Sequence, residues 1–125
     1  MMIYCCKDLI FATKIRATAD SLSLPSRPAR DAAALQKRLD RVDDGQPNEP
    51  VSGVIIDLEM GDDALALVDQ IKKHSASIPV VAFGSHLATQ TLQAAREHGA
   101  DFVMPRSVFA ANLPNIIERM SGEKV

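Results

Sequence analysis

Short runs of apolar residues alternate with longer amphipathic stretches along the whole of this chain. Such alternation is typical of βαβ units, which build a parallel sheet covered by helices. Strands that fit the pattern cover residues 2–6, 22–27, 51–57, 78–83 and 100–104. We therefore expect a single α/β domain over residues 1–125, with a five-stranded parallel sheet.

Two of these strands have a predictable place in the sheet. The segment 51–57 is apolar on both faces, as a central parallel strand must be when helices cover both sides. The segment 22–27 contains Pro25 and is followed by Pro28, and neither residue has a backbone N–H. Such a strand is confined to the edge of a sheet.

Aspartates mark the starts of the first three predicted helices. Asp8 and Asp31 stand where N-caps are expected, and Asp62 places an acid at the positive end of the third helix dipole. The inward positions are Phe11, Ile15, Ala19 and Leu22 in the first helix, Ala32, Leu35, Leu39 and Val42 in the second, and Leu65, Val68 and Ile71 in the third. The polar segment 43–50 predicts a loop.

The last two helices are delimited by glycine, asparagine and proline. The fourth covers about residues 88–98 and ends at Gly99, which can adopt the left-handed conformation of a helix stop. The last helix begins either at Ser107 or at Asn112, because Pro114 would remove an interior hydrogen bond from a helix that starts at Ser107. Its inward positions are Leu113, Ile116, Ile117 and Met120.

The composition supports one globular domain and argues against a membrane or a nucleic acid as partner. The chain has 125 residues, of which 46% are hydrophobic and 24% charged. No apolar run approaches the roughly 20 residues that cross a bilayer, so we expect a cytoplasmic protein without a membrane partner. With four Phe, one Tyr and no Trp, the chain offers few aromatic side chains for stacking on bases, and nucleic-acid binding is not expected.

The only cysteines, Cys5 and Cys6, are adjacent in the sequence. A disulfide between neighbours would be strained, and the pair lacks the C-x-x-C spacing of a metal or redox site. We interpret both residues as core thiols.

The functional end of an open α/β sheet lies outside the carboxyl ends of its strands. The residues at or just after these strand ends are Cys6 and Lys7, Asp57, Gly84 to His86, and Pro105 with Arg106. Ser85, His86 and Asp57 are residue types of a catalytic triad, but adjacent residues rarely face each other as a nucleophile and its base must. We therefore expect no catalytic residue and no enzyme activity.

Three segments resemble the receiver (CheY-like) domain of response regulators: VIIDLEM at the third strand, IPVVAFGSH at the fourth and GADFVMPRSVF from the fifth. The resemblance covers nearly the whole chain. It implies a doubly wound, flavodoxin-like sheet with strand order 2-1-3-4-5 and a role in two-component signal transduction. In that family the aspartate ending the third strand accepts a phosphoryl group from a histidine kinase, and Asp57 falls on this position.

The positions around Asp57 depart from the family's pattern. Receivers carry an acidic pair after strand 1 that helps to bind Mg²⁺, a Thr or Ser at the end of strand 4, and a Lys-Pro pair at the end of strand 5. The replacements here are Cys6 and Lys7 for the acidic pair, Gly84 followed by Ser85 for the hydroxyl residue, and Arg106 with Ser107 for Lys-Pro.

These replacements change the charge of the expected site. Mg²⁺ prefers hard oxygen ligands, and phosphoryl transfer depends on positioning and charge neutralisation. With one carboxylate against Lys7 and Arg106, the site has little to attract a metal, and we expect no metal or cofactor. Lys7 is expected to take the metal's place in a salt bridge with Asp57; alternatively, backbone N–H groups at the next helix hold this carboxylate.

Three functions remain open at this point. The leading hypothesis is a stand-alone pseudo-receiver, a regulatory or scaffolding module that works without phosphorylation through contacts made by helix 4, strand 5 and helix 5. Its partner would be a histidine kinase, another signalling protein or a second copy of the chain. The alternatives are a phosphoacceptor switched at Asp57, and a binder of small anions at the crevice formed by Lys7, Asp57, Gly84, Ser85 and Arg106.

Overall fold

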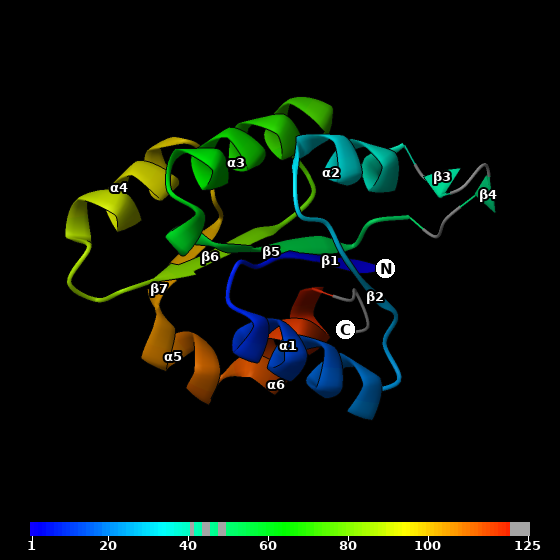
Figure 1. Cartoon of the computed structure of the whole chain (residues 1–125), viewed down its shortest axis with the longest axis horizontal. Helices are drawn as coiled ribbons and strands as arrows, with labels where there is room; N and C mark the ends of the chain where they lie inside the picture. Colours follow the sequence, from blue (N-terminus) through cyan, green and yellow to red (C-terminus); the bar gives the residue numbers. More distant parts are fainter. Residues whose placement is uncertain (41, 44–45, 48–49, 121–125) are drawn as a thin grey trace.

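The computed structural model describes residues 1–40, 42–43, 46–47 and 50–120. Its central sheet has the strand order β2-β1-β5-β6-β7, and every neighbouring pair is parallel (Figure 1). The strands are β1 (Met2–Cys5), β2 (Ser26–Pro28), β5 (Gly53–Asp57), β6 (Val80–Gly84) and β7 (Phe102–Pro105). The doubly wound α/β fold and its strand order are therefore confirmed, with the direction of winding reversing between β1 and β5.

Helices cover both faces of the sheet (Figure 1). One face is covered by α1 (Leu9–Ser21), α5 (Arg106–Ala111) and α6 (Leu113–Met120), and the other by α2 (Ala32–Leu39), α3 (Asp62–His74) and α4 (Thr89–Glu97). Alternate residues of β5 point into the two layers: Ile55 packs with α1 and α6, whereas Val54 and Ile56 pack with α2, α3 and α4. All five residues of β5 are buried, as expected for a central strand.

The predicted helix ends agree closely with the structure. Asp8 caps α1 by accepting a hydrogen bond from the backbone N–H of Ile10 at 2.8 Å, and Asp31 caps α2 through Ala34 N at 2.8 Å. Helix α3 starts at Asp62. Gly99 has φ of +111° after α4, in the region that favours glycine at a helix stop.

Three sequence predictions were wrong in detail. Strand β2 starts later than expected and includes Pro28, although it does form an edge of the sheet. Val42 belongs to β3 (Val42–Asp43), which pairs with β4 (Gln46–Pro47) in a short antiparallel ladder inside the predicted loop; residues 44–45 and 48–49 of that loop lie outside the described part. Ala32 is exposed and Leu65 is half-buried, because the buried stripes pass through Leu35 and Leu39 in α2 and Leu67 in α3.

The predicted last helix is two helices, and both proposed starts are used. Helix α5 begins at Arg106, directly after β7, and α6 begins at Leu113, next to Pro114. Asn112 separates them: its side-chain amide donates to the carbonyl of Val108 at 2.8 Å, which closes the end of α5. The chain can turn here because Pro114 lacks the N–H that a continuous helix would use.

The amino end of β7 is held to β6 by Asp101. Its carboxylate accepts from Val80 N at 2.8 Å and from Lys72 Nζ at 2.6 Å. Lys72 also donates to the carbonyl of Ile78 at 2.7 Å, so one side chain of α3 joins two strands. In the described part of the chain, no helix has the length and apolar character needed to cross a membrane.

Candidate functional site

The carboxyl ends of β1, β5, β6 and β7 meet at one end of the sheet (Figure 1). Asp57 is the last residue of the central strand β5. Its side chain has no exposed surface. It is the only buried charged residue among those that the structure describes. A buried carboxylate needs hydrogen-bond donors, so its partners define the site.

Both carboxylate oxygens of Asp57 accept hydrogen bonds from neighbouring turns. Its Oδ2 accepts from the backbone N–H groups of Lys7 at 3.1 Å and Asp8 at 3.3 Å, and its Oδ1 accepts from Glu59 N at 3.0 Å. The Cys6 thiol lies 3.5 Å from Oδ2. The carboxylate thus joins the turn between β1 and α1 to the turn that follows β5.

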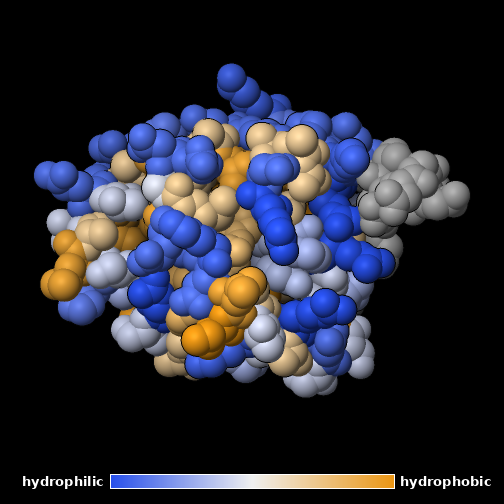
Figure 2. Space-filling model, in the orientation of Figure 1, coloured by the Kyte–Doolittle hydropathy of each residue, from blue (hydrophilic) through white to orange (hydrophobic). Residues whose placement is uncertain are grey.

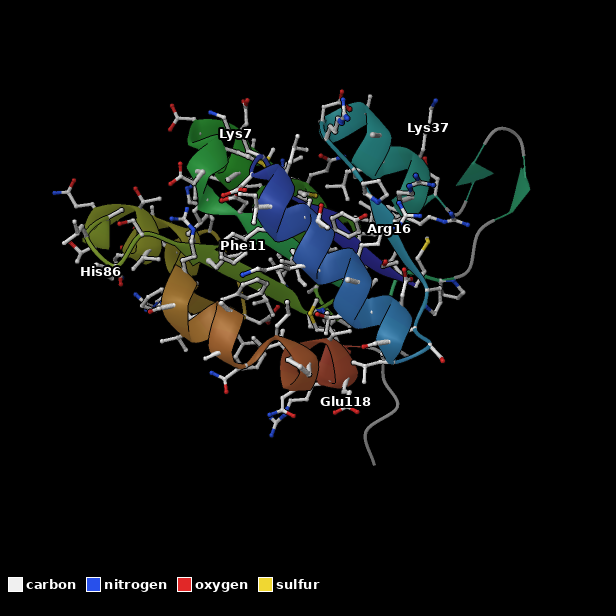
Figure 3. All side chains as sticks on the ribbon, turned by 60° about the horizontal axis from the view of Figure 1, so that its bottom comes forward. Lys7, Phe11, Arg16, Lys37, His86 and Glu118 are labelled. Atoms are coloured by element: carbon white, nitrogen blue, oxygen red, sulfur yellow. The ribbon has the colours of Figure 1, made fainter. Side chains whose placement is uncertain are left out.

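The expected salt bridge between Lys7 and Asp57 is wrong. Among the ion pairs of the described residues, Lys7 Nζ has no carboxylate partner, and the Lys7 side chain is exposed at the start of α1 (Figure 3). The backbone N–H of Lys7 makes the contact instead. The alternative prediction, that backbone N–H groups at the next helix hold Asp57, agrees with the geometry for Glu59, whereas the N–H groups of Lys7 and Asp8 belong to the turn before α1.

Cys6 takes part in the site as a protonated thiol. Burial, together with the charge and hydrogen bond of the neighbouring Asp57, raises the pKa of Cys6 to about 12. Burial alone raises the pKa of Cys5 to about 12. Both thiols are therefore neutral at physiological pH. Cys5 is a buried core residue, as predicted, whereas Cys6 is only partly buried.

Gly84 ends β6 beside Asp57, since β5 and β6 pair Asp57 with Phe83. A Cβ placed on Gly84 would lie 3.2 Å from Leu58 Cβ and 3.5 Å from Leu58 Cδ1. The buried side chain of Leu58 therefore fills the space into which a hydroxyl side chain at this position would extend. Ser85, one position later, accepts from the backbone N–H of Leu87 at 3.2 Å and shapes the turn before α4.

Arg106 is engaged by residues that the sequence interpretation had not included. Its Nη2 donates to Glu59 Oε2 at 2.9 Å, and its guanidinium lies 5.6 Å from the centre of the Phe11 ring. The hydrogen bond to Glu59 is the main cause of a raised pKa of Arg106, and the charges of Asp57 and Asp8 act in the same direction. The VIIDLEM segment contains Glu59, but only the fold reveals a partner 47 positions away.

The predicted site residues are thus brought to one edge of the sheet without forming one cluster. Asp57 and Gly84 are buried neighbours, Lys7 is exposed, and Arg106 pairs with Glu59 above the end of β5. Within the described residues, no group of three or more His, Cys, Asp or Glu side chains is arranged to hold a metal ion.

No protein-family model matches the chain, and no curated protein sequence does so either. Solved structures with the same fold include the receiver domain of NtrX from Brucella abortus, with 21% identity and a TM-score of 0.77 over 99% of this chain and 100% of that domain. FixJ-N has 16% identity and a TM-score of 0.73, over 99% of this chain and 94% of its own. The phosphorylated cyanobacterial phytochrome response regulator RcpA has 12% identity and a TM-score of 0.79, over 99% and 95%.

The chain spans only 26% of the longer NtrX chain that was solved in complex with ADP. The match lies in the fold, because sequence identities in this range leave the residues of the functional edge free to differ. The solved structures that this chain resembles are receiver domains of response regulators, and the chain has the receiver-domain fold.

Proposed function

We propose that this chain is a pseudo-receiver, a module that regulates or scaffolds other signalling proteins through protein contacts and does not depend on phosphorylation. The observation that carries the proposal is the closed environment of Asp57. Its carboxylate has no exposed surface, and both of its oxygens accept hydrogen bonds from the protein. Its role is to hold two turns together.

An aspartate that accepts a phosphoryl group must approach the donor in line, and nearby cations must neutralise the transferred oxygens. Asp57 could become accessible only if the turn containing Lys7 and Asp8 moved away and two hydrogen bonds were lost. This requirement weighs against phosphorylation of the folded protein.

The other groups that would stabilise a phosphoryl group are replaced or occupied. Gly84 has no hydroxyl, and Leu58 fills the adjoining space. The Arg106 guanidinium is bound by Glu59, so an incoming anion would have to compete with a carboxylate 2.9 Å away. The phosphoacceptor alternative and the anion site that combines Lys7 with Arg106 are both less well supported for these reasons.

The surface formed by α4, β7 and α5 is the proposed contact site for a protein partner. Phe102, on the edge strand β7, is 56% exposed, and Val108 on α5 is also exposed. Apolar side chains at an edge strand suit a protein contact, because a partner would bury them. A histidine kinase, another signalling protein and a second copy of this chain are the candidate partners, and the role is regulatory and not enzymatic.

Incubation with acetyl phosphate and Mg²⁺, followed by intact mass measurement, tests the proposal. We expect no mass increase of one phosphoryl group in the wild-type chain, and the same spectrum for Asp57→Asn. Amide spectra recorded with beryllofluoride and Mg²⁺ should likewise show no change at Lys7, Asp8 or Glu59. A phosphoryl adduct that appears in the wild type and is missing from Asp57→Asn would overturn the proposal.

A further inference from the structure

Two cavities adjoin at the carboxyl ends of the strands, next to the place where the winding reverses, and together they form one hollow. The larger, of about 520 Å³, is lined by Cys6, Lys7, Leu9, Arg30, Met60 and Asp63. The second, of about 280 Å³, shares Cys6, Leu9 and Arg30 with it and adds Tyr4 and Arg16, among others. Open α/β sheets bind ligands in this place, between the loops that follow the strands on either side of the reversal.

The cavity walls carry uncompensated positive charge. Lys7, Arg16 and Arg30 are exposed, and their side chains form no ion pair or hydrogen bond within the described part of the chain. Asp63 is the single acid in the two linings, so their formal charge is +2. Arg106 lines neither cavity.

Lys7, Arg16 and Arg30 surround the same hollow, so one ligand could contact all three. Figure 3 shows Lys7 at the start of α1 and Arg16 on the side of this helix that faces β2, whereas Phe11 lies on the side that faces α5. Arg30 follows β2 and contributes to both cavities. Three like charges around one hollow repel each other, and an anion between them would relieve this repulsion.

The rim of the hollow is apolar. Leu9 is 74% exposed and its neighbour Ile10 is 70% exposed. In Figure 2, hydrophobic surface projects over the start of α1, with hydrophilic surface beside it. A ligand that combined an anionic group with an apolar or ring portion would therefore meet complementary surface on both parts.

We propose that this hollow binds a small organic phosphate. A phosphate monoester carries a charge of about −1.5 to −2 at neutral pH, which complements the formal charge of the lining. The guanidinium groups of Arg16 and Arg30 can each present two parallel N–H donors to its oxygens, and Lys7 adds a point charge. The organic part packs against Leu9 and Met60. The ligand is bound without reaction, and Asp57 and Arg106 are not involved.

Amide NMR titration of the whole chain with phenyl phosphate tests this site. We expect saturable shifts centred on the amides of Leu9, Thr13 and Arg30, with weaker binding of inorganic phosphate, which lacks the ring, and no such shifts with phenol, which lacks the charge. Added salt should weaken the binding, because the attraction is largely between charges.

Three variants separate this site from general attraction to a basic surface. Arg30→Gln should weaken binding of phenyl phosphate by roughly tenfold, because it removes a bidentate charged contact. Arg16→Gln combined with Arg30→Gln should abolish the saturable shifts. Lys37→Gln is the matched control: Lys37 is an exposed cation on α2 that lines neither cavity, and its replacement should leave the affinity unchanged (Figure 3).

The proposal would be overturned if phenyl phosphate caused no saturable shifts at these amides, if Arg30→Gln and Lys37→Gln had equal effects, or if an acidic peptide bound here while phenyl phosphate did not. These outcomes are distinct from failure of the pseudo-receiver proposal. Failure there would appear as a covalent adduct at Asp57 in the presence of acetyl phosphate, whereas phenyl phosphate binding leaves the mass of the protein unchanged.

Discussion

Asp57 lies at the carboxyl ends of the parallel strands and Asp101 at their amino ends, and the two side chains are held in different ways. Asp101 stands before β7 with a side chain that is 40% exposed, and Lys72 Nζ contacts it at 2.6 Å. Asp57 stands at the end of β5 with no exposed surface, and its partners are N–H and S–H donors without a full charge. The lysine–aspartate pair expected at Asp57 occurs instead at Asp101.

The difference shows that a buried aspartate and a partly exposed aspartate can each hold segments of the fold together, with different kinds of donor. At Asp101, a charged partner supplied by α3 ties two strands together. At Asp57, three backbone N–H groups would be left without an acceptor if the carboxylate were absent. Each aspartate secures a connection of the fold, and neither arrangement requires a metal ion.

Of the substitutions that test this comparison, replacement of Asp57 should lower stability the most. We expect Asp57→Ala to lower the free energy of unfolding by about 3 kcal/mol or more, because it leaves several buried donors unsatisfied. Asp57→Asn keeps one acceptor oxygen and should cost less. Urea denaturation measures both variants. In a receiver pocket with several carboxylates, removal of one acid would relieve repulsion, so a gain in stability would contradict our description of Asp57.

Replacement of Lys72, which contacts Asp101, and of Lys7, near Asp57, compares the two aspartates directly. Lys72→Met should cost about 2 kcal/mol, because Lys72 is largely buried and donates to Asp101 and to the carbonyls of Ile78 and Ala76. Lys7→Met is the matched control and should change the free energy of unfolding by no more than about 0.5 kcal/mol. Equal losses from both variants would show that Lys7 does stabilise the fold through its side chain.

Restoration of a hydroxyl at Gly84 should have a smaller, unfavourable effect. Gly84→Ser brings a Cβ to within 3.2 Å of Leu58 Cβ, and we expect a loss of about 1 to 2 kcal/mol from the crowding. The same substitution should cost less in a Leu58→Ala background, since the two positions are in contact. If Gly84→Ser cost as much in both backgrounds, Leu58 would not be the residue that excludes a hydroxyl.

The raised pKa values of Cys5 and Cys6 should cause a loss of stability that is confined to alkaline pH. In the folded protein the pKa of Cys6 is raised to about 12 from its ordinary value of 9.0, and that of Cys5 is raised equally. Unfolded chains therefore release thiol protons first, and stability should fall as pH rises from 9 towards 12. Urea midpoints measured across this range should fall less steeply in Cys5→Ala/Cys6→Ser; identical slopes would contradict the raised pKa values.

The fold could be predicted from the sequence because its signals are local. Asp8 and Asp31 stand directly before the helices that they cap, and Gly99 directly after the helix that it ends. The apolar segment that contains β5 required a central position, and the prolines around β2 required an edge. The short ladder of β3 and β4 was missed because two-residue strands carry no periodic pattern.

The position of the site could be predicted from the sequence, but the contacts between its residues could not. Asp57 was placed correctly at the end of a buried strand, yet its contact with Lys7 depends on the turn after β1, which presents the backbone N–H and directs the side chain outward. The pairing of Glu59 with Arg106 joins distant segments, and no local pattern predicts it. Packing of Leu58 against Gly84 is likewise visible only in three dimensions.

Titration of the wild-type chain with Mg²⁺, followed by amide NMR, tests most directly whether the edge at Asp57 is closed. The backbone N–H groups of Lys7, Asp8 and Glu59 report on this carboxylate, because all of them donate to it. The closed arrangement predicts that these resonances show no saturable change with Mg²⁺. Saturable shifts at these positions that disappear in Asp57→Asn would show that the carboxylate binds the metal and would contradict the pseudo-receiver account.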